Sequence, residues 1–138
     1  MTEIQKTIEI LDKLISFPTV SSDSNRDCID WISDYLKSYG ATCKISSEAD
    51  GKANIFATLG PDIDGGIILS GHTDVVPVIG QNWSSDPFKM KRENDSFYGR
   101  GTCDMKGFIA STLAMVPKYS GMTLKRPLHF AFTYDEEV

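Results

Sequence analysis

Three short segments place acidic or imidazole side chains directly after apolar or glycine-rich runs. They are Gly-His-Thr-Asp at Gly71–Asp74, Gly-Thr-Cys-Asp at Gly101–Asp104, and Tyr-Asp-Glu-Glu at Tyr134–Glu137. In open α/β sheets, ligands bind at the carboxyl ends of the strands. His72 follows one strand-like run, and Glu136 and Glu137 follow another. This arrangement predicts that the three side chains project into one shared site.

The spacing of His72 and Asp74 has a chemical reason if His72 binds a metal. A metal-binding imidazole needs a hydrogen bond at its second ring nitrogen, because this bond fixes the tautomer and the basicity of the ring. Asp74 lies two residues further on, on the same side of an extended chain, and its carboxylate can accept that bond. The alternative is a surface turn held by an Asx-type bond. The spacing alone leaves both interpretations open.

The other acidic residues also allow a structural interpretation. Asp104 lies among glycines, which let a carboxylate approach a ligand closely, but it also stands where a helix begins and could cap the first free amides. Glu136 and Glu137 could act as a metal ligand and a general acid–base, or they could form a solvated turn. Their position after an apolar strand favours the catalytic interpretation. His129, in the middle of that strand, is interpreted as structural.

Alternating helical and strand-like patterns must position these residues. Apolar residues at three- to four-residue spacing predict helices over residues 2–15, 29–39 and about 105–116, the last ending before Pro117. Strands are predicted at Thr42–Ser46, Asn54–Leu59, Gly66–Ser70 and Leu128–Tyr134, with a hairpin or irregular excursion at Met90–Tyr98. Helices interleaved with strands indicate one α/β unit, a three-layer sandwich with a mainly parallel sheet.

Composition excludes several classes of partner. The 138 residues include 14 basic and 19 acidic side chains, a net charge of -5, and the Lys and Arg residues form no cluster, so we expect neither nucleic acid nor a membrane surface as a partner. The longest apolar stretches fall short of the roughly 18 residues that span a bilayer, and the N-terminus does not resemble a secretory signal. We therefore expect a cytoplasmic protein that acts on a small molecule. Neither a disulfide framework nor a thiolate zinc site is indicated by the three cysteines, Cys28, Cys43 and Cys103.

Read together, the motifs resemble those of a dinuclear-zinc hydrolase family that includes deacetylases and desuccinylases of N-acyl amino acids, aminoacylases and carboxypeptidase-type metallopeptidases. Three motifs stand in the family's order and spacing, and the resemblance covers essentially the whole chain, including the helix exit Phe17–Ser21. Within the family, the acetylornithine deacetylases are most similar in two further segments, Trp83–Phe88 and Gly99–Phe108.

The resemblance implies a role for each motif residue. His72 would bind one zinc ion, Glu137 the other, and Asp104 would bridge the two. Asp74 would orient His72, and Glu136 would be the general base. Two Zn²⁺ ions are implied as cofactors, with Co²⁺ as an alternative. A cis peptide bond after Asp104 is implied as well.

The implied reaction is hydrolysis of N-acetyl-L-ornithine to L-ornithine and acetate, a step of arginine biosynthesis. Desuccinylation of succinyl-diaminopimelate and general aminoacylase or peptidase activity are alternatives, and a non-catalytic module that binds a metal or a partner is an alternative of another class. The family also has another metal carboxylate, a late histidine and a lid or dimerisation domain. None of these falls within residues 1–138, so we expect this chain to be the N-terminal part of a catalytic domain, inactive and weakly zinc-binding alone, from a homodimeric parent protein.

Overall fold

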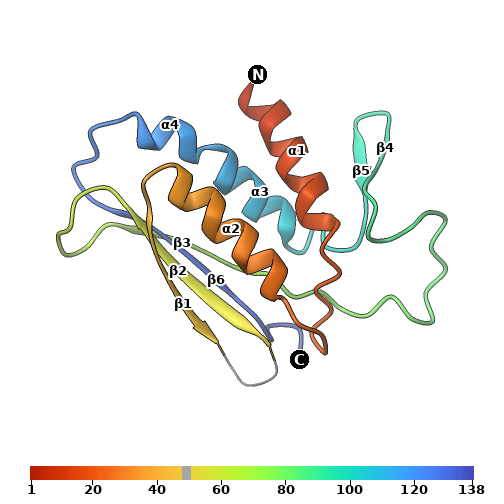
Figure 1. Ribbon diagram of the computed structural model, residues 1–138. Helices are drawn as coiled ribbons and strands as arrows, with labels where there is room; N and C mark the ends of the chain where they lie inside the picture. The colour runs from red at the N-terminus through yellow and green to blue at the C-terminus, as the bar shows by residue number, and fades with distance from the viewer. Residues whose placement is uncertain (48–50) are drawn as a thin grey trace.

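The computed structural model describes residues 1–47 and 51–138 and builds them into helices packed on a four-stranded sheet (Figure 1). The elements, in chain order, are α1 (Glu3–Ile15), α2 (Arg26–Ser38), β1 (Thr42–Ser47), β2 (Ala53–Leu59), β3 (Ile67–His72), β4 (Lys91–Glu93), β5 (Ser96–Tyr98), α3 (Lys106–Ala114), α4 (Val116–Ser120) and β6 (Leu128–Thr133). The predicted α/β class is confirmed, and the predicted strands and hairpin form within one or two residues of their expected ends.

The main sheet has the strand order β1-β2-β6-β3. β6 pairs parallel with β3, whereas β1 with β2 and β2 with β6 are antiparallel pairs. The expectation of a mainly parallel sheet is therefore wrong for the described residues, whose sheet is mixed. A parallel pair needs a long crossover, which α3 and α4 supply between β3 and β6, whereas the short connection from β1 to β2 permits only an antiparallel pair.

The helices lie on one face of this sheet, so the described residues show two of the three predicted layers (Figure 1). The core lies between the layers, where α2 and α3 contact the sheet directly and α1 packs against α3. Ile29 and Ile32 of α2 and Phe130 and Phe132 of β6 are fully buried there. Burying side chains of this kind stabilises a fold by about 1.5–3 kcal/mol each.

Pro117 does not end the helical region as predicted. α3 ends at Ala114, and α4 begins at Val116 with the proline in its first turn. The first turn of a helix has no intrahelical partner for its N–H groups, so a residue without an N–H is tolerated there. The predicted hairpin is present as β4 and β5, and Asn94 takes a positive φ of 55° at its turn.

A buried cation joins α3 to the end of α1. Lys106 is only 1% exposed, and its Nζ donates hydrogen bonds to the carbonyl oxygens of Leu14, at 2.9 Å, and Phe17, at 2.7 Å. Burial lowers the pKa of Lys106 to about 8 from its ordinary value of 10.5. Lys106 therefore holds the start of α3 against the chain that leaves α1.

Replacing Lys106 with Met in the full-length protein should destabilise the fold by about 1–3 kcal/mol, because two buried carbonyl groups lose their donor. From pH 8 to 10.5 the unfolded chain binds more protons at this position than the folded chain, so the wild type gains stability relative to the variant as pH rises. Denaturant unfolding across this range measures the difference, with the exposed Lys118→Met as control. If the difference in the free energy of unfolding between wild type and variant does not change with pH, the expectation is wrong.

Candidate metal centre

His72 ends β3 with both ring nitrogens engaged and its side chain buried. Nδ1 lies 2.9 Å from the carbonyl oxygen of Asp74 and 3.4 Å from its Oδ1. Nε2 lies 3.0 Å from Oδ1 of Asp104. The carbonyl oxygen of Asp74 only accepts hydrogen bonds, so Nδ1 donates to it, and Oδ1 of Asp104 can accept a hydrogen bond from a protonated Nε2.

The surroundings of His72 favour its charged form. Burial alone would lower the pKa of the imidazole, but the hydrogen bonds to Asp74 and Asp104 and the charges of Asp74 and Glu136 outweigh burial and raise the pKa above 6.5. The Nδ1 bond to the carbonyl of Asp74 leaves Nε2 as the nitrogen that faces the acidic groups. A cation bound at Nε2 would replace a proton that these same acids stabilise.

Asp74 links three separate segments of the chain. Its buried carboxylate accepts hydrogen bonds from Ser21 Oγ at 2.6 Å, from the backbone N–H of Glu136 at 3.2 Å and from that of Glu137 at 3.1 Å. Burial alone would raise the pKa of this carboxyl, but these three donors and His72 lower it below 3.8. The alternative of a solvent-exposed turn at Asp74 is therefore wrong, because the carboxylate is buried and bonds distant residues.

The loop after α1 runs alongside the residues that follow β3. The backbone N–H of Ser21 donates to the carbonyl of Val75, and the N–H of Val75 donates to the carbonyl of Thr19. Asn25 adds hydrogen bonds from its amide to Ala53 and Thr73. Sequence reasoning missed Ser21 and Asn25 as supports of the site. The helix exit Phe17–Ser21 resembles that of the family, but no local pattern shows what its side chains contact.

The acidic segment after β6 brings its two glutamates to His72. One ligand atom from each of His72, Glu136 and Glu137 lies within 4.8 Å of the other two, and Oε2 of Glu136 is 3.7 Å from Nε2 of His72. Burial and the nearby charge of Asp104 raise the pKa of Glu137 above its ordinary value of 4.5. Like charges therefore crowd around the imidazole, and a divalent cation would relieve this repulsion.

Asp104 does not cap α3. The N-cap position is Met105, and no side chain caps the first amides of the helix. The carboxylate of Asp104 instead contacts His72 and is 71% exposed. With Glu137 it lines a hollow of about 250 Å³ between the Gly99–Cys103 turn and Val76. The peptide bond between Asp104 and Met105 is cis, as the resemblance implied.

The side chains predicted for the site therefore converge, although Asp104 reaches His72 without joining the three-residue cluster. One imidazole and three carboxylates supply the nitrogen and oxygen donors that zinc takes in proteins. The hydrogen-bonded Nδ1 of His72 is the support that a ligating histidine requires. The residues present thus fit a metal ion, and the roles of the individual ligands stay predictions.

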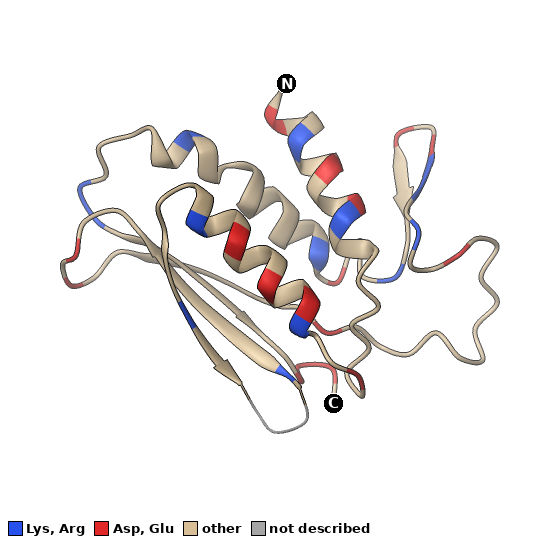
Figure 2. Ribbon diagram, viewed as in Figure 1, with Lys and Arg blue, Asp and Glu red and all other residues tan. Residues whose placement is uncertain are grey.

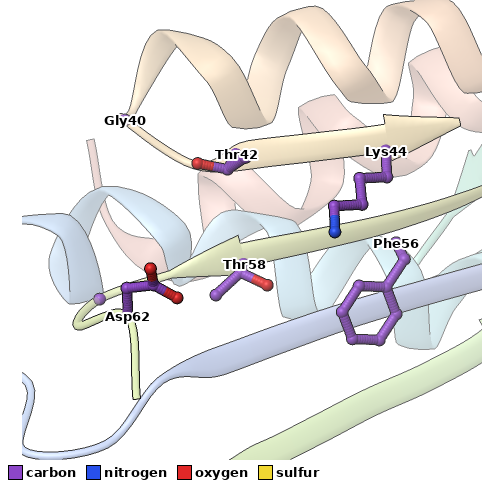
Figure 3. A pocket seen from close by; sticks show the side chains of 7 residues that line it. Gly40, Thr42, Lys44, Phe56, Thr58 and Asp62 are labelled. Atoms are coloured by element: carbon purple, nitrogen blue, oxygen red, sulfur yellow. The ribbon is translucent and has the colours of Figure 1, made fainter. Parts of the chain in front are cut away.

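His129 lies apart from this cluster, on the outer face of the sheet. Its Nδ1 is 2.9 Å from Thr58 Oγ1, its Nε2 is 3.1 Å from the carbonyl oxygen of Gly65, and its ring stacks on Phe56. Phe56 and Thr58 also line a groove of about 390 Å³ near the end of β2 (Figure 3). The antiparallel register places that end of β2 beside the start of β6, away from the acidic segment.

Within residues 1–47 and 51–138, no helix has the length and apolar character needed to cross a bilayer.

Comparisons with known proteins agree with this geometry. Acetylornithine deacetylase of Pasteurella multocida is 37% identical over 145 aligned positions, and the match covers 99% of this chain and 38% of that protein. Acetylornithine deacetylase of Buchnera aphidicola from Schizaphis graminum is 37% identical over 98% of this chain and 37% of its own length. The chain therefore spans less than two fifths of these curated relatives.

Solved structures share the fold. The dipeptidase Dug1p of Saccharomyces cerevisiae superposes with a TM-score of 0.80 and 26% identity, over 97% of this chain and 33% of its own. A family M20 metallo-carboxypeptidase of Sulfolobus solfataricus gives a TM-score of 0.83 at 20% identity, over 96% of this chain and 31% of its own. A model of peptidase family M20/M25/M40 matches residues 68–138. Since that match covers just over half of the chain and contains every predicted metal ligand, this chain belongs to peptidase family M20/M25/M40.

Proposed function

We propose that this chain is the metal-binding part of an amide hydrolase that converts N-acetyl-L-ornithine and water to L-ornithine and acetate, a reaction of arginine biosynthesis. The observation that carries the proposal is the cluster of His72, Glu136 and Glu137, with Asp104 bonded to the same imidazole. The choice of substrate is supported by the relatives named acetylornithine deacetylase, which match 98–99% of this chain.

His72, Asp104 and Glu137 would hold the metal, with Asp104 between two Zn²⁺ ions or two Co²⁺ ions. Bound zinc polarises an amide carbonyl and makes water a stronger acid. Each zinc ion takes about four ligands, so three side chains cannot complete two such sites. We therefore expect the full-length protein to be the active species, with further ligands from outside residues 1–138.

Glu136 is the proposed proton carrier. Its carboxylate lies beside His72 and is 61% exposed, so both water and substrate can reach it. It accepts a proton from the attacking water as the new carbon–oxygen bond forms. It then donates that proton to the amide nitrogen as the carbon–nitrogen bond breaks, so the products are acetate and a free amine.

A second candidate is hydrolysis of a dipeptide, which breaks the same kind of bond. It is supported by the 26% identity to the dipeptidase Dug1p over 97% of this chain. Both substrates carry an amide next to an amino-acid carboxylate, and the residues of this site act only on the amide.

Steady-state assays of the full-length protein separate these candidates. We expect kcat/KM for N-acetyl-L-ornithine to exceed that for succinyl-diaminopimelate and for dipeptides by at least about tenfold, corresponding to a difference of 1.4 kcal/mol in transition-state binding. Chelation should abolish turnover, and added Zn²⁺ should restore it. A preference for the succinyl substrate or for dipeptides would overturn the choice of acetylornithine, and activity that survives chelation would overturn the metal mechanism.

A further inference from the structure

The acidic segment turns toward His72 at a residue with an unusual backbone. Asp135 has a positive φ of 59°, a left-handed conformation that costs side-chain-bearing residues about 1–2 kcal/mol. It stands between the end of β6 and the two glutamates, Glu136 and Glu137. The direction in which the glutamates leave the sheet therefore depends on what holds Asp135 in place.

Lys52 binds the side chain of Asp135 from a position 83 residues earlier in the chain. Its Nζ lies 2.7 Å from Oδ1 and 3.0 Å from Oδ2, and the two side chains are 14% and 34% exposed. In Figure 2, a blue segment at the start of β2 lies beside red segments near the C-terminus. Solvent screens such a half-buried, two-point contact less than it screens a surface ion pair.

Residues at the start of β2 also hold the backbone next to Asp135. Oδ1 of Asn54 accepts a hydrogen bond from the N–H of Tyr134 at 3.2 Å, and Nζ of Lys52 lies 5.7 Å from the Tyr134 ring centre. On the far side of the turn, Asp74 accepts the N–H groups of the two glutamates. The turn is thus held from both sides, by β2 on one side and by the end of β3 on the other.

Asp135, the first of three consecutive acids, pairs with Lys52, whereas the two acids that follow it lie near His72. Lys52 neutralises Asp135, and among the described residues the cluster of potential ligand atoms at His72 contains Glu136 and Glu137 but not Asp135. Without Lys52, the carboxylate of Asp135 would lose this partner one residue from the cluster, and its charge would add to the repulsion there.

We propose that Lys52 is a positioning residue of the metal centre: its ion pair with Asp135 sets the left-handed turn that presents Glu136 and Glu137 to His72. This inference rests on the proposed function for its catalytic consequence, but its effect on metal binding does not depend on which substrate is hydrolysed.

The test compares lysine variants of the full-length protein that keep the aliphatic stem. We expect Lys52→Met to weaken Zn²⁺ binding by about 10- to 100-fold, the usual effect of removing a support of metal ligands. We also expect kcat to fall by a similar factor with KM nearly unchanged, and the absorption spectrum of the Co²⁺-loaded protein to shift. Lys52→Arg should keep the Zn²⁺ affinity and kcat within about threefold of the wild-type values, because arginine can make the same two-point contact.

Two controls make the test specific. Lys91→Met removes an exposed lysine that pairs with Glu93 at 2.8 Å, and it should change neither Zn²⁺ affinity nor kcat. Asp135→Asn keeps a residue type that tolerates the left-handed backbone but removes the charge, so it should weaken Zn²⁺ binding in the same direction. The double variant of Lys52 and Asp135 should lose no more than Lys52→Met alone, because both changes remove one interaction.

Wild-type Zn²⁺ affinity in Lys52→Met would overturn the inference, as would a lower melting temperature with unchanged Zn²⁺ affinity and kcat. If Lys52→Met does not fold, the Zn²⁺ affinity and kcat of Asp135→Asn are compared with those of Lys52→Arg and the wild type instead. If the wild type hydrolyses none of the amide substrates, the proposed function fails, and the Zn²⁺ titrations still decide the role of Lys52.

Discussion

Glu136→Gln in the full-length protein should lower kcat by about 10²- to 10⁴-fold while Zn²⁺ remains bound, because general acid–base catalysis contributes a factor of this size. The amide has the shape of the carboxylate but cannot take a proton from water near pH 7. Glu136 sits 3.7 Å from His72 Nε2 and remains largely exposed, which suits a group that exchanges protons with substrate. Turnover assays and metal analysis of the same preparation measure both quantities.

The matched control is Glu93→Gln, which removes the charge of an exposed glutamate in the β4–β5 hairpin and should leave kcat unchanged. Near-normal turnover of Glu136→Gln would remove Glu136 from the proton-transfer steps. Loss of Zn²⁺ together with turnover would instead make Glu136 a metal ligand, which the 4.8 Å cluster with His72 and Glu137 makes a definite alternative.

Asp74→Asn should reduce Zn²⁺ affinity by about 10- to 100-fold and kcat/KM by at least as much. The Asp74 carboxylate accepts hydrogen bonds from Ser21, Glu136 and Glu137 and lies beside His72. An asparagine has one oxygen in place of two and adds an N–H₂ group that can only donate, so buried donors lose their acceptor at about 1–3 kcal/mol each. Zinc titration and steady-state kinetics test the expectation.

The lowered pKa of Asp74 gives this prediction a pH signature. The stability that its ionised form contributes is present above pH 3.8, the ordinary value, and is lost as the pH falls through the lower value of the folded protein. Asp74→Asn should lack that contribution at neutral pH and show a weaker acid dependence of unfolding. Wild-type zinc affinity in Asp74→Asn would show that the backbone carbonyl of residue 74 alone orients His72.

The helices and strands could be predicted from local patterns, because each pattern depends on residues only a few positions apart in the chain. The apolar spacing of α1 places Ile10, Leu11, Leu14 and Ile15 on one buried stripe, and the alternation of β6 places Phe130 and Phe132 inward. The strand order was not predictable in this way. β6 enters the sheet between β2 and β3, and such long-range pairing depends on the packing of α3 and α4 in the crossover.

The candidate site could also be predicted only in part. The residue types and order of His72, Asp104, Glu136 and Glu137 were readable from the chain, because strand ends and glycine-rich turns carry local signals and because the motifs resemble a known family. The support of these residues was not readable. Ser21 lies 53 residues from Asp74, and Lys52 lies 83 residues from Asp135, so no local pattern links them.

By itself, the sequence determined the α/β class and the helices and strands, since these follow from local periodicity, and its resemblance to a known family indicated which side chains could bind a metal. Only the tertiary structure decided that the sheet is mixed, that Asp104 contacts His72 instead of capping α3, and that Asp74 and Lys52 hold the acidic turn from opposite sides. The physical reason is that a hydrogen bond or ion pair depends on distances of about 3 Å between atoms, and the packing of the whole sheet and its helices sets those distances.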